Sequence, residues 1–388
     1  MDGLISAIPL LHGALTAARR DDLGRIDEAL LRFGVTGVHG EAEVGITRLI
    51  EAAIARAEHP CIRVDLDGAT SDTDVAWLLA RGLARVILGP ALSMVLLPPG
   101  LRPASADRHF IQFAEAAGRR VADLSVSEQA TAPDMPVPEV LDAVGRVYEQ
   151  SVQSPALWID HLQAPTLTPR HPLDVDALLW NVRTIQQKFE MPVIVSGHRT
   201  ATPVAYGKRG AFHGDGLWVS IGRPGLAVWL DAADALGASA PTPGWTVAMA
   251  EITHGHPATT LLALALSAEF AARRPDPLHL WRFMLSSDDG HVARAILHAR
   301  TLHRLGGRVL EQIAQGAGPY EDAPSDQRRK EIHRAVTRLH EGGLITQPRP
   351  RTWEVTNPLV AGRLRREAPS SIYDASPCDP REHEPTGV

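Results

Sequence analysis

The segment Gly40-Glu-Ala-Glu-Val-Gly45-Ile46-Thr47 places two glycines and a threonine in the spacing Gly-x4-Gly-x-[Ser/Thr]. This is the spacing of a P-loop, in which successive backbone N–H groups and a helix N-terminus converge on a phosphate. A P-loop has lysine before its hydroxyl residue, whereas this chain has Ile46. The spacing alone is expected about 0.3 times by chance in this composition, so its meaning depends on its context.

The flanking segments predict a strand before this loop and a helix after it. Residues 33–38 form a short apolar and β-branched run, and residues 41–57 place Ile46, Leu49 and Ile50 on one helical face. A strand, a glycine-rich loop and a helix in this order are what phosphate binding requires. A glycine-rich turn without a ligand is the alternative interpretation.

The rest of the first half alternates between short apolar strands and amphipathic helices. Continuously apolar strands of this kind are typical of a parallel sheet that helices cover on both faces. The sequence therefore predicts an α/β core. The expected strands are residues 61–66, 156–160 and 192–196, and the expected helices are residues 74–88, 106–118, 138–151 and 174–189.

Polar side chains follow two of these strands. The run Ala156-Leu-Trp-Ile-Asp160 ends in a carboxylate, which a P-loop needs at the end of a neighbouring buried strand. The next residue, where active hydrolases commonly have a glutamate that polarises water, is His161; a neutral imidazole there could accept a proton near pH 7. The following strand ends at Ser196, which could sense a γ-phosphate. Purely structural roles for Asp160 and Ser196 are the alternative.

The second half of the chain changes character. After Arg223 the periodicity indicates helices only, and from residue 308 it indicates helix, turn, helix and two short strands, the outline of a winged helix. The last residues are rich in proline and acids and cannot bury enough surface to fold. The expected units are N-terminal helices (1–32), an α/β core (33–225), a helical lid (226–305), a winged helix (306–367) and a disordered tail (368–388).

Charge is distributed unevenly along the chain. Residues 291–370 carry 14 Arg and Lys against 8 Asp and Glu, whereas the remainder carries 25 against 37 and the whole chain has a net charge of −6. A local basic module of this kind suits phosphate contacts with duplex DNA. The alternative is that it packs on the acidic core or on a partner protein. The candidate DNA-binding residues are Arg328, Arg329, Lys330, Arg334 and Arg338 on the predicted recognition helix, with Arg349 and Arg351 on the wing.

The order of elements over residues 30–367 resembles the AAA+ superfamily, in particular the archaeal-type and STAND-like ATPases and the origin-recognition ATPases. The resemblance implies ATP or ADP between core and lid, with Pro257 beside it, Thr47 and Asp160 on a magnesium ion, and a lid arginine near the γ-phosphate. The motifs that carry it are Gly40, Gly45, Thr47, Asp160, Ser196, Gly255-His256-Pro257 and Asn357-Pro358-Leu359.

The chain departs from that pattern at three positions. Ile46 replaces the lysine, His161 the catalytic acid, and Ala258 the usual lid arginine. Removing one charge-assisted hydrogen bond to phosphate costs roughly 1.5–3 kcal/mol, and removing a general base slows turnover by roughly 10²–10⁴-fold. Lys208 and Arg209 could reach a neighbouring subunit's site as a finger, although a solvated basic turn is the simpler interpretation.

These observations predict an AAA+-like nucleotide-binding switch or pseudo-ATPase with a winged-helix arm for DNA or a partner. ATP or ADP with Mg²⁺ is expected to bind weakly or not at all. Two alternatives stay open: an active ATPase completed by neighbouring subunits of a homo-oligomer, and a nucleotide-free scaffold. The apolar runs at residues 86–97 and 261–266 are too short for a bilayer span, and the two cysteines form no disulfide framework, so we expect a cytoplasmic protein without a membrane partner.

Overall fold

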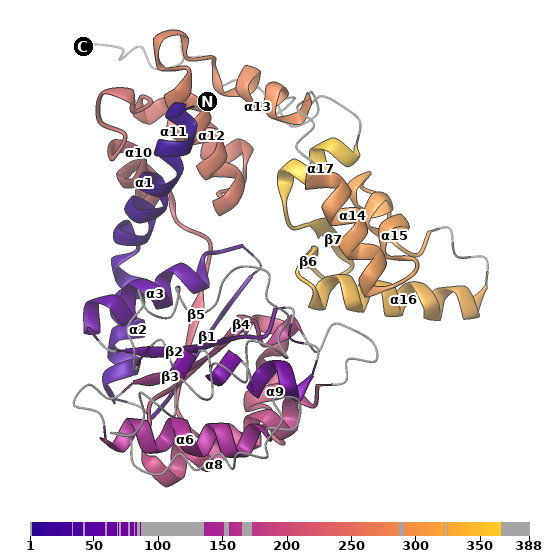
Figure 1. Ribbon diagram of the computed structural model, residues 1–388. Helices are drawn as coiled ribbons and strands as arrows, with labels where there is room; N and C mark the ends of the chain where they lie inside the picture. Colours follow the sequence, from indigo (N-terminus) through magenta and orange to yellow (C-terminus); the bar gives the residue numbers. More distant parts are fainter. Residues whose placement is uncertain are drawn as a thin grey trace, which may run out of the picture.

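The computed structural model of the 388-residue chain describes residues 2–32, 34–41, 43–58, 60–67, 69, 71–76, 78–80, 82–83, 86, 136–150, 155–164, 173–286, 291–321, 323 and 325–365. The predicted helix at 106–118 and the predicted tail at 368–388 lie outside these residues. Figure 1 shows an α/β body, a helical unit above it and a C-terminal unit to one side.

A five-stranded parallel sheet forms the centre of the body, in the order β2-β3-β4-β1-β5. The three strands expected after the loop are present, and every residue of β3 is buried, which explains why its sequence is apolar up to the final Asp160. We did not predict β5; its burial alternates along one edge of the sheet, so it lacks such a run. The strands are β1 (Val35–Gly40), β2 (Cys61–Asp65), β3 (Ala156–Asp160), β4 (Val193–His198) and β5 (Leu217–Ile221).

Helices cover both faces of this sheet, as the sequence predicts. On one face α2 (Arg20–Arg32) and α3 (Ile46–Ala57) enclose an apolar cluster that contains Val38 and Trp158. On the other face α6 (Val137–Gln150) and α8 (Val175–Phe189) pack against the remaining strand side chains (Figure 1). A short helix, α9 (Thr202–Tyr206), lies between β4 and β5 along the chain.

The helical unit combines the first helix with the segment that follows β5. Although the sequence groups α1 (Asp2–Ala18) with α2, α1 packs instead against α10 and α12 through Leu11 and Leu15. No helix in the described part of the chain has the length and apolar character of a membrane span. The other helices of the unit are α10 (Leu226–Asp234), α11 (Pro243–Ile252), α12 (Pro257–Glu269) and α13 (Pro277–Ser286).

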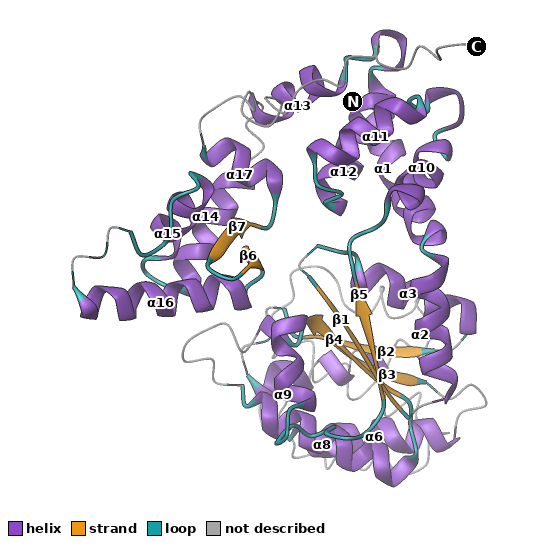
Figure 2. Cartoon of the chain, turned by 180° about the vertical axis from the view of Figure 1, so that it is seen from behind, coloured by secondary structure: helices purple, strands orange, loops and turns teal. Residues whose placement is uncertain are grey.

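The C-terminal unit, which lies at the left of Figure 2, has an apolar core of its own. Helix α14 belongs to this core, although the sequence places residues up to 305 in the lid. Ala299 and Leu302 of α14 are buried there, and Gly306 allows α15 to approach closely, since a Cβ atom at Gly306 would lie 1.9 Å from the Ala299 carbonyl oxygen. The unit contains α14 (His291–Leu302), α15 (Gly306–Ala314), α16 (Asp326–Glu341), β6 (Ile345–Arg349), β7 (Thr352–Val355) and α17 (Pro358–Leu364).

Candidate functional site

The glycine-rich loop joins the carboxyl end of β1 to α3, and both of its motif glycines are required by the backbone. Gly45 has φ +87° and is the N-cap of α3, so the helix begins at Ile46 and not at residue 41 as the periodicity suggests. A Cβ atom at Gly40 would lie 2.6 Å from the Ile221 carbonyl oxygen of β5. Because the N-cap is a glycine, no N-cap side chain occupies the first N–H groups of α3, which point out of the helix toward the loop.

Two arginines that the sequence pattern did not reveal hold this loop in place. Arg19, at the junction of α1 and α2, is buried and donates to the carbonyl oxygens of Val44 at 2.6 Å and Gly222 at 2.7 Å. Arg223, which follows β5, contacts Glu41 of the loop at 3.0 Å. The arrangement depends on contacts between segments far apart along the chain, so periodicity gives no signal for it.

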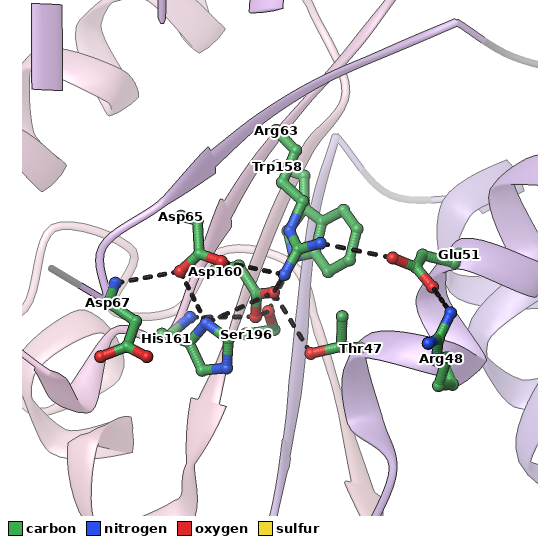
Figure 3. A network of polar contacts seen from close by, with 10 residues as sticks. All are labelled: Thr47, Arg48, Glu51, Arg63, Asp65, Asp67, Trp158, Asp160, His161 and Ser196. Atoms are coloured by element: carbon green, nitrogen blue, oxygen red, sulfur yellow. Dashed lines mark hydrogen bonds and ion pairs between the residues drawn. The ribbon is translucent and has the colours of Figure 1, made fainter. Parts of the chain in front are cut away.

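Two residues predicted for the site, Thr47 and Ser196, contact a third, Asp160. The Thr47 hydroxyl, in the first turn of α3, donates to Asp160 Oδ2 at 3.2 Å, and the Ser196 hydroxyl of β4 donates to Asp160 Oδ1 at 2.6 Å (Figure 3). The Trp158 indole N–H donates in turn to Ser196 Oγ at 2.7 Å. The Asp160 side chain is only 2% exposed, so these bonds compensate a carboxylate that is removed from water.

A further residue in the network, Arg63 of β2, was not predicted. Its Nη2 lies 2.6 Å from Asp160 Oδ2 and 3.2 Å from Asp65 Oδ2, and its Nη1 lies 3.3 Å from Glu51 Oε1 (Figure 3). The guanidinium also lies 4.6 Å from the centre of the Trp158 ring. The sequence did contain a signal for this residue: Arg63 and Asp65 are two residues apart on a predicted strand, and therefore lie on one face of the sheet.

His161 is paired with an acid. It has φ +56°, and its Nδ1 lies 2.7 Å from Asp65 Oδ1 and 3.7 Å from Asp160 Oδ2. The hydrogen bond with Asp65 raises the pKa of His161 above its ordinary value, although burial opposes this. Burial alone would raise the pKa of Asp65, but the contacts with His161, the Asp67 N–H and Arg63 lower it. The charged imidazolium is thus favoured, which argues against the neutral proton acceptor that we considered from the sequence.

We expect this pair to make stability pH-dependent. The raised pKa of His161 contributes stability that is complete below its ordinary value of 6.5 and is lost as the pH rises through the higher folded value. His161→Asn keeps a residue that tolerates positive φ. It should lower the free energy of unfolding by about 1 kcal/mol more at about pH 5.5 than at about pH 9 in urea titrations. Equal decreases at the two pH values would contradict the pairing.

Thr47 and Asp160, which the resemblance assigns to magnesium, do not fit that ion in this arrangement. Asp65, Asp160 and His161 bring potential ligand atoms within 4.8 Å of one another. However, the Arg63 guanidinium already occupies Asp160 Oδ2, and His161 Nδ1 occupies Asp65 Oδ1. A hard divalent cation needs carboxylate oxygens that are free to coordinate it, and these two oxygens already accept hydrogen bonds from nitrogen donors.

The helical unit and the C-terminal unit both reach the loop at Glu43. His256 caps α12, with Pro257 buried in its first turn, and His256 Nε2 lies 3.2 Å from Glu43 Oε2. The side-chain amide of Asn357, which caps α17, donates to Glu43 Oε2 at 3.3 Å. Burial, with the nearby charge of Arg223, lowers the pKa of His256 to about 3, so the imidazole is neutral. The Gly-His-Pro and Asn-Pro-Leu motifs therefore meet at one loop residue.

A cavity of about 360 Å³ lies beside this meeting point. Polar side chains from all three units line it, among them Glu43, His256, Arg294 and Thr356, together with apolar residues of the C-terminal unit such as Leu310. The cavity thus adjoins the loop between β1 and α3.

The remaining predicted residues lie away from the loop. Lys208 and Arg209 are exposed in the turn after α9, and Arg349 and Arg351 are exposed on the β6–β7 hairpin. On α16, Arg329, Lys330 and Arg334 are exposed. Arg328 and Arg338 instead pair with Glu331 and Glu341 of the same helix, each at 3.1 Å.

Comparisons by sequence and by structure gave different results. No protein-family model and no curated protein sequence matches the chain. The Walker-type ATPase of Pyrococcus abyssi is similar in structure with a TM-score of 0.59 and 13% identity, over 89% of this chain and 95% of that one. Two Aeropyrum pernix structures also align: ORC1 in complex with DNA (TM-score 0.42, 13% identity, 91% and 93% covered) and ORC2 in ADPNP–ADP complexes (0.49, 12%, 92% and 95%).

The likeness to the Walker-type ATPase, together with the parallel sheet and the loop between β1 and α3, shows that the chain has an α/β P-loop NTPase fold. The α/β P-loop core predicted from the sequence is thereby confirmed.

Proposed function

We propose that the chain is an AAA+-like nucleotide-binding switch with a degenerate ATPase site and a winged-helix arm. The observation that carries the proposal is the 3.2 Å hydrogen bond from Thr47 to Asp160, which joins the first turn of α3 to the end of β3. Phosphate-binding loops use a hydroxyl and a carboxylate in these positions. Gly40, Gly45 and Pro257 would line the nucleotide, and Ser196 would adjoin its terminal phosphate.

Slow hydrolysis is part of this proposal. Ile46 offers the phosphates no charge, and its side chain packs into the apolar cluster under α3. His161, at the position of the catalytic acid, is engaged with Asp65 at 2.7 Å. A nucleotide would therefore be held by backbone N–H groups and retained or released without rapid turnover.

Contacts between the units suggest how a nucleotide bound at the loop would affect the C-terminal unit. Glu43 of the loop contacts Asn357 at the start of α17. In the short 3₁₀ turn that follows β4, the Thr200 hydroxyl donates to the Glu341 carbonyl oxygen of α16 at 3.0 Å. Ser196, on β4 itself, contacts Asp160. A phosphate in the loop would thus act on the two elements to which the C-terminal unit is attached.

For the arm, exposed basic residues on α16 and on the β6–β7 hairpin favour duplex DNA as the partner. A protein partner is the second candidate, because two of the arginines of α16 are already paired within the helix. In a homo-oligomer, the exposed Lys208 and Arg209 could reach a neighbouring site and complete an active ATPase. We propose that the protein acts in the cytoplasm.

Titration of a fluorescent ATP analogue into the full-length chain tests the switch. We expect weak, saturable binding and no phosphate release above background in steady-state assays at any protein concentration. Specific activity that rises with protein concentration would favour the shared-site oligomer. If neither ATP nor ADP bound, the nucleotide switch would be wrong and the scaffold alternative would remain.

A further inference from the structure

The position that a metal ion takes in a phosphate-binding loop of this kind is already occupied by a side chain. Thr47 Oγ1 and Arg63 Nη2 converge on the same oxygen, Asp160 Oδ2, at 3.2 and 2.6 Å (Figure 3). A cation bound by the Thr47 hydroxyl and the Asp160 carboxylate would have to share that oxygen. In this chain the shorter contact to it comes from a guanidinium.

Arg63 is held in place from several sides. Asp65 and Glu51 contact its two terminal nitrogens at 3.2 and 3.3 Å, and the Trp158 ring lies 4.6 Å from its central carbon. The pairing of β2 with β3 sets Arg63 opposite Trp158 and Asp65 opposite Asp160. Because a guanidinium stays charged and has a rigid planar geometry, this is a permanent cation in a fixed position.

Arg63 carries the positive charge that the loop lacks. Ile46 removes the positive charge that a lysine would bring, and Arg63 supplies one near Thr47 from β2, the strand next to β3. The Arg63 side chain is 30% exposed, and its buried Nε has no hydrogen-bond partner among the described residues. A guanidinium with unused N–H groups is suited to phosphate oxygens.

We propose that Arg63 takes the place of magnesium, so that the site binds a nucleoside di- or triphosphate without a divalent cation. This rests on the proposed nucleotide-binding function and adds its ionic requirement. Asp160 then serves as the anchor of Arg63 and not as a metal ligand. The site should therefore discriminate little between the free and the metal-bound form of the nucleotide.

The test compares wild type with Arg63→Met, which keeps an unbranched apolar stem and removes the guanidinium with its charge. Arg48→Met is the matched control, since Arg48 pairs with the same Glu51 at 3.2 Å, is well exposed and loses the same charge. A fluorescent ATP analogue is titrated in EDTA and in excess Mg²⁺. We expect wild-type and Arg48→Met Kd values to agree within about twofold in the two buffers, and Arg63→Met to bind roughly tenfold or more weakly in EDTA.

A second readout uses Mn²⁺ alone, followed by its electron paramagnetic resonance signal. Wild type and Arg48→Met should bind no Mn²⁺ at this site, whereas Arg63→Met frees Oδ2 of Asp160 and Oδ2 of Asp65 and should bind it. The Mn²⁺ measurement decides the role of Arg63 even if no nucleotide binds. In that case only the proposed nucleotide-binding function is wrong. Nucleotide binding by wild type that requires Mg²⁺, or Mn²⁺ binding by wild type, would overturn the proposal without any variant having to fold.

Discussion

Replacing Ile46 by lysine is expected to tighten binding of ATP by roughly ten- to a hundredfold, which is the value of one charge-assisted hydrogen bond to phosphate. The loop already has the required backbone: Gly45 starts α3 in a left-handed conformation, and Gly40 leaves room beside Ile221. Ile46 is the first residue of α3 and is partly exposed, so a lysine stem can follow the same path and place its ammonium group beyond the apolar cluster.

The measurement is a titration of a fluorescent ATP analogue into both proteins. Ile54→Lys is the control, because it adds the same charge to a partly buried position two turns further along α3. An equal gain in affinity in both variants would mean that the added charge attracts the nucleotide nonspecifically. No gain in either variant would mean that the loop does not bind phosphate. If Arg63 replaces magnesium, the gain for Ile46→Lys should appear in EDTA as well as in Mg²⁺.

Reversing the charges of Arg329 and Arg334 on α16 should weaken binding to duplex DNA more than tenfold at low salt, provided that each neutralises a phosphate. Both side chains are exposed. The slope of log Kobs against log salt concentration should fall in magnitude by about 0.9 for each phosphate that the variant no longer neutralises. Mobility-shift titrations of the full-length chain on unrelated duplex sequences should show little sequence preference.

A matched control reverses Arg273 and Arg282 of the helical unit, which are also exposed and carry the same charge. This double variant should bind DNA nearly as well as wild type. A parallel decrease in both double variants would show that net charge alone governs binding. Failure of the wild-type chain to shift DNA at low salt would eliminate the DNA-binding interpretation and leave the protein-partner one.

The core of the fold was predictable because its signals are local. Residues 156–159 form an unbroken apolar run, since β3 is buried on both faces, and Asp160 ends that run at the last residue of the strand. The loop motif is likewise contained in eight consecutive residues. Edge strand β5 is short and alternates in burial, so it carries too little hydrophobic pattern to stand out from its surroundings.

The sequence by itself therefore determined the P-loop fold and the residue types Gly40, Gly45, Thr47 and Asp160. Only the tertiary structure decided what surrounds them. Arg63 lies 97 positions before Asp160, and their contact follows from the register of β2 against β3, which no local pattern encodes. The docking of Asn357 onto Glu43 joins residues 314 positions apart. Periodicity reports which face of an element is buried, whereas the partner of a polar side chain depends on which elements become neighbours when the apolar faces pack together.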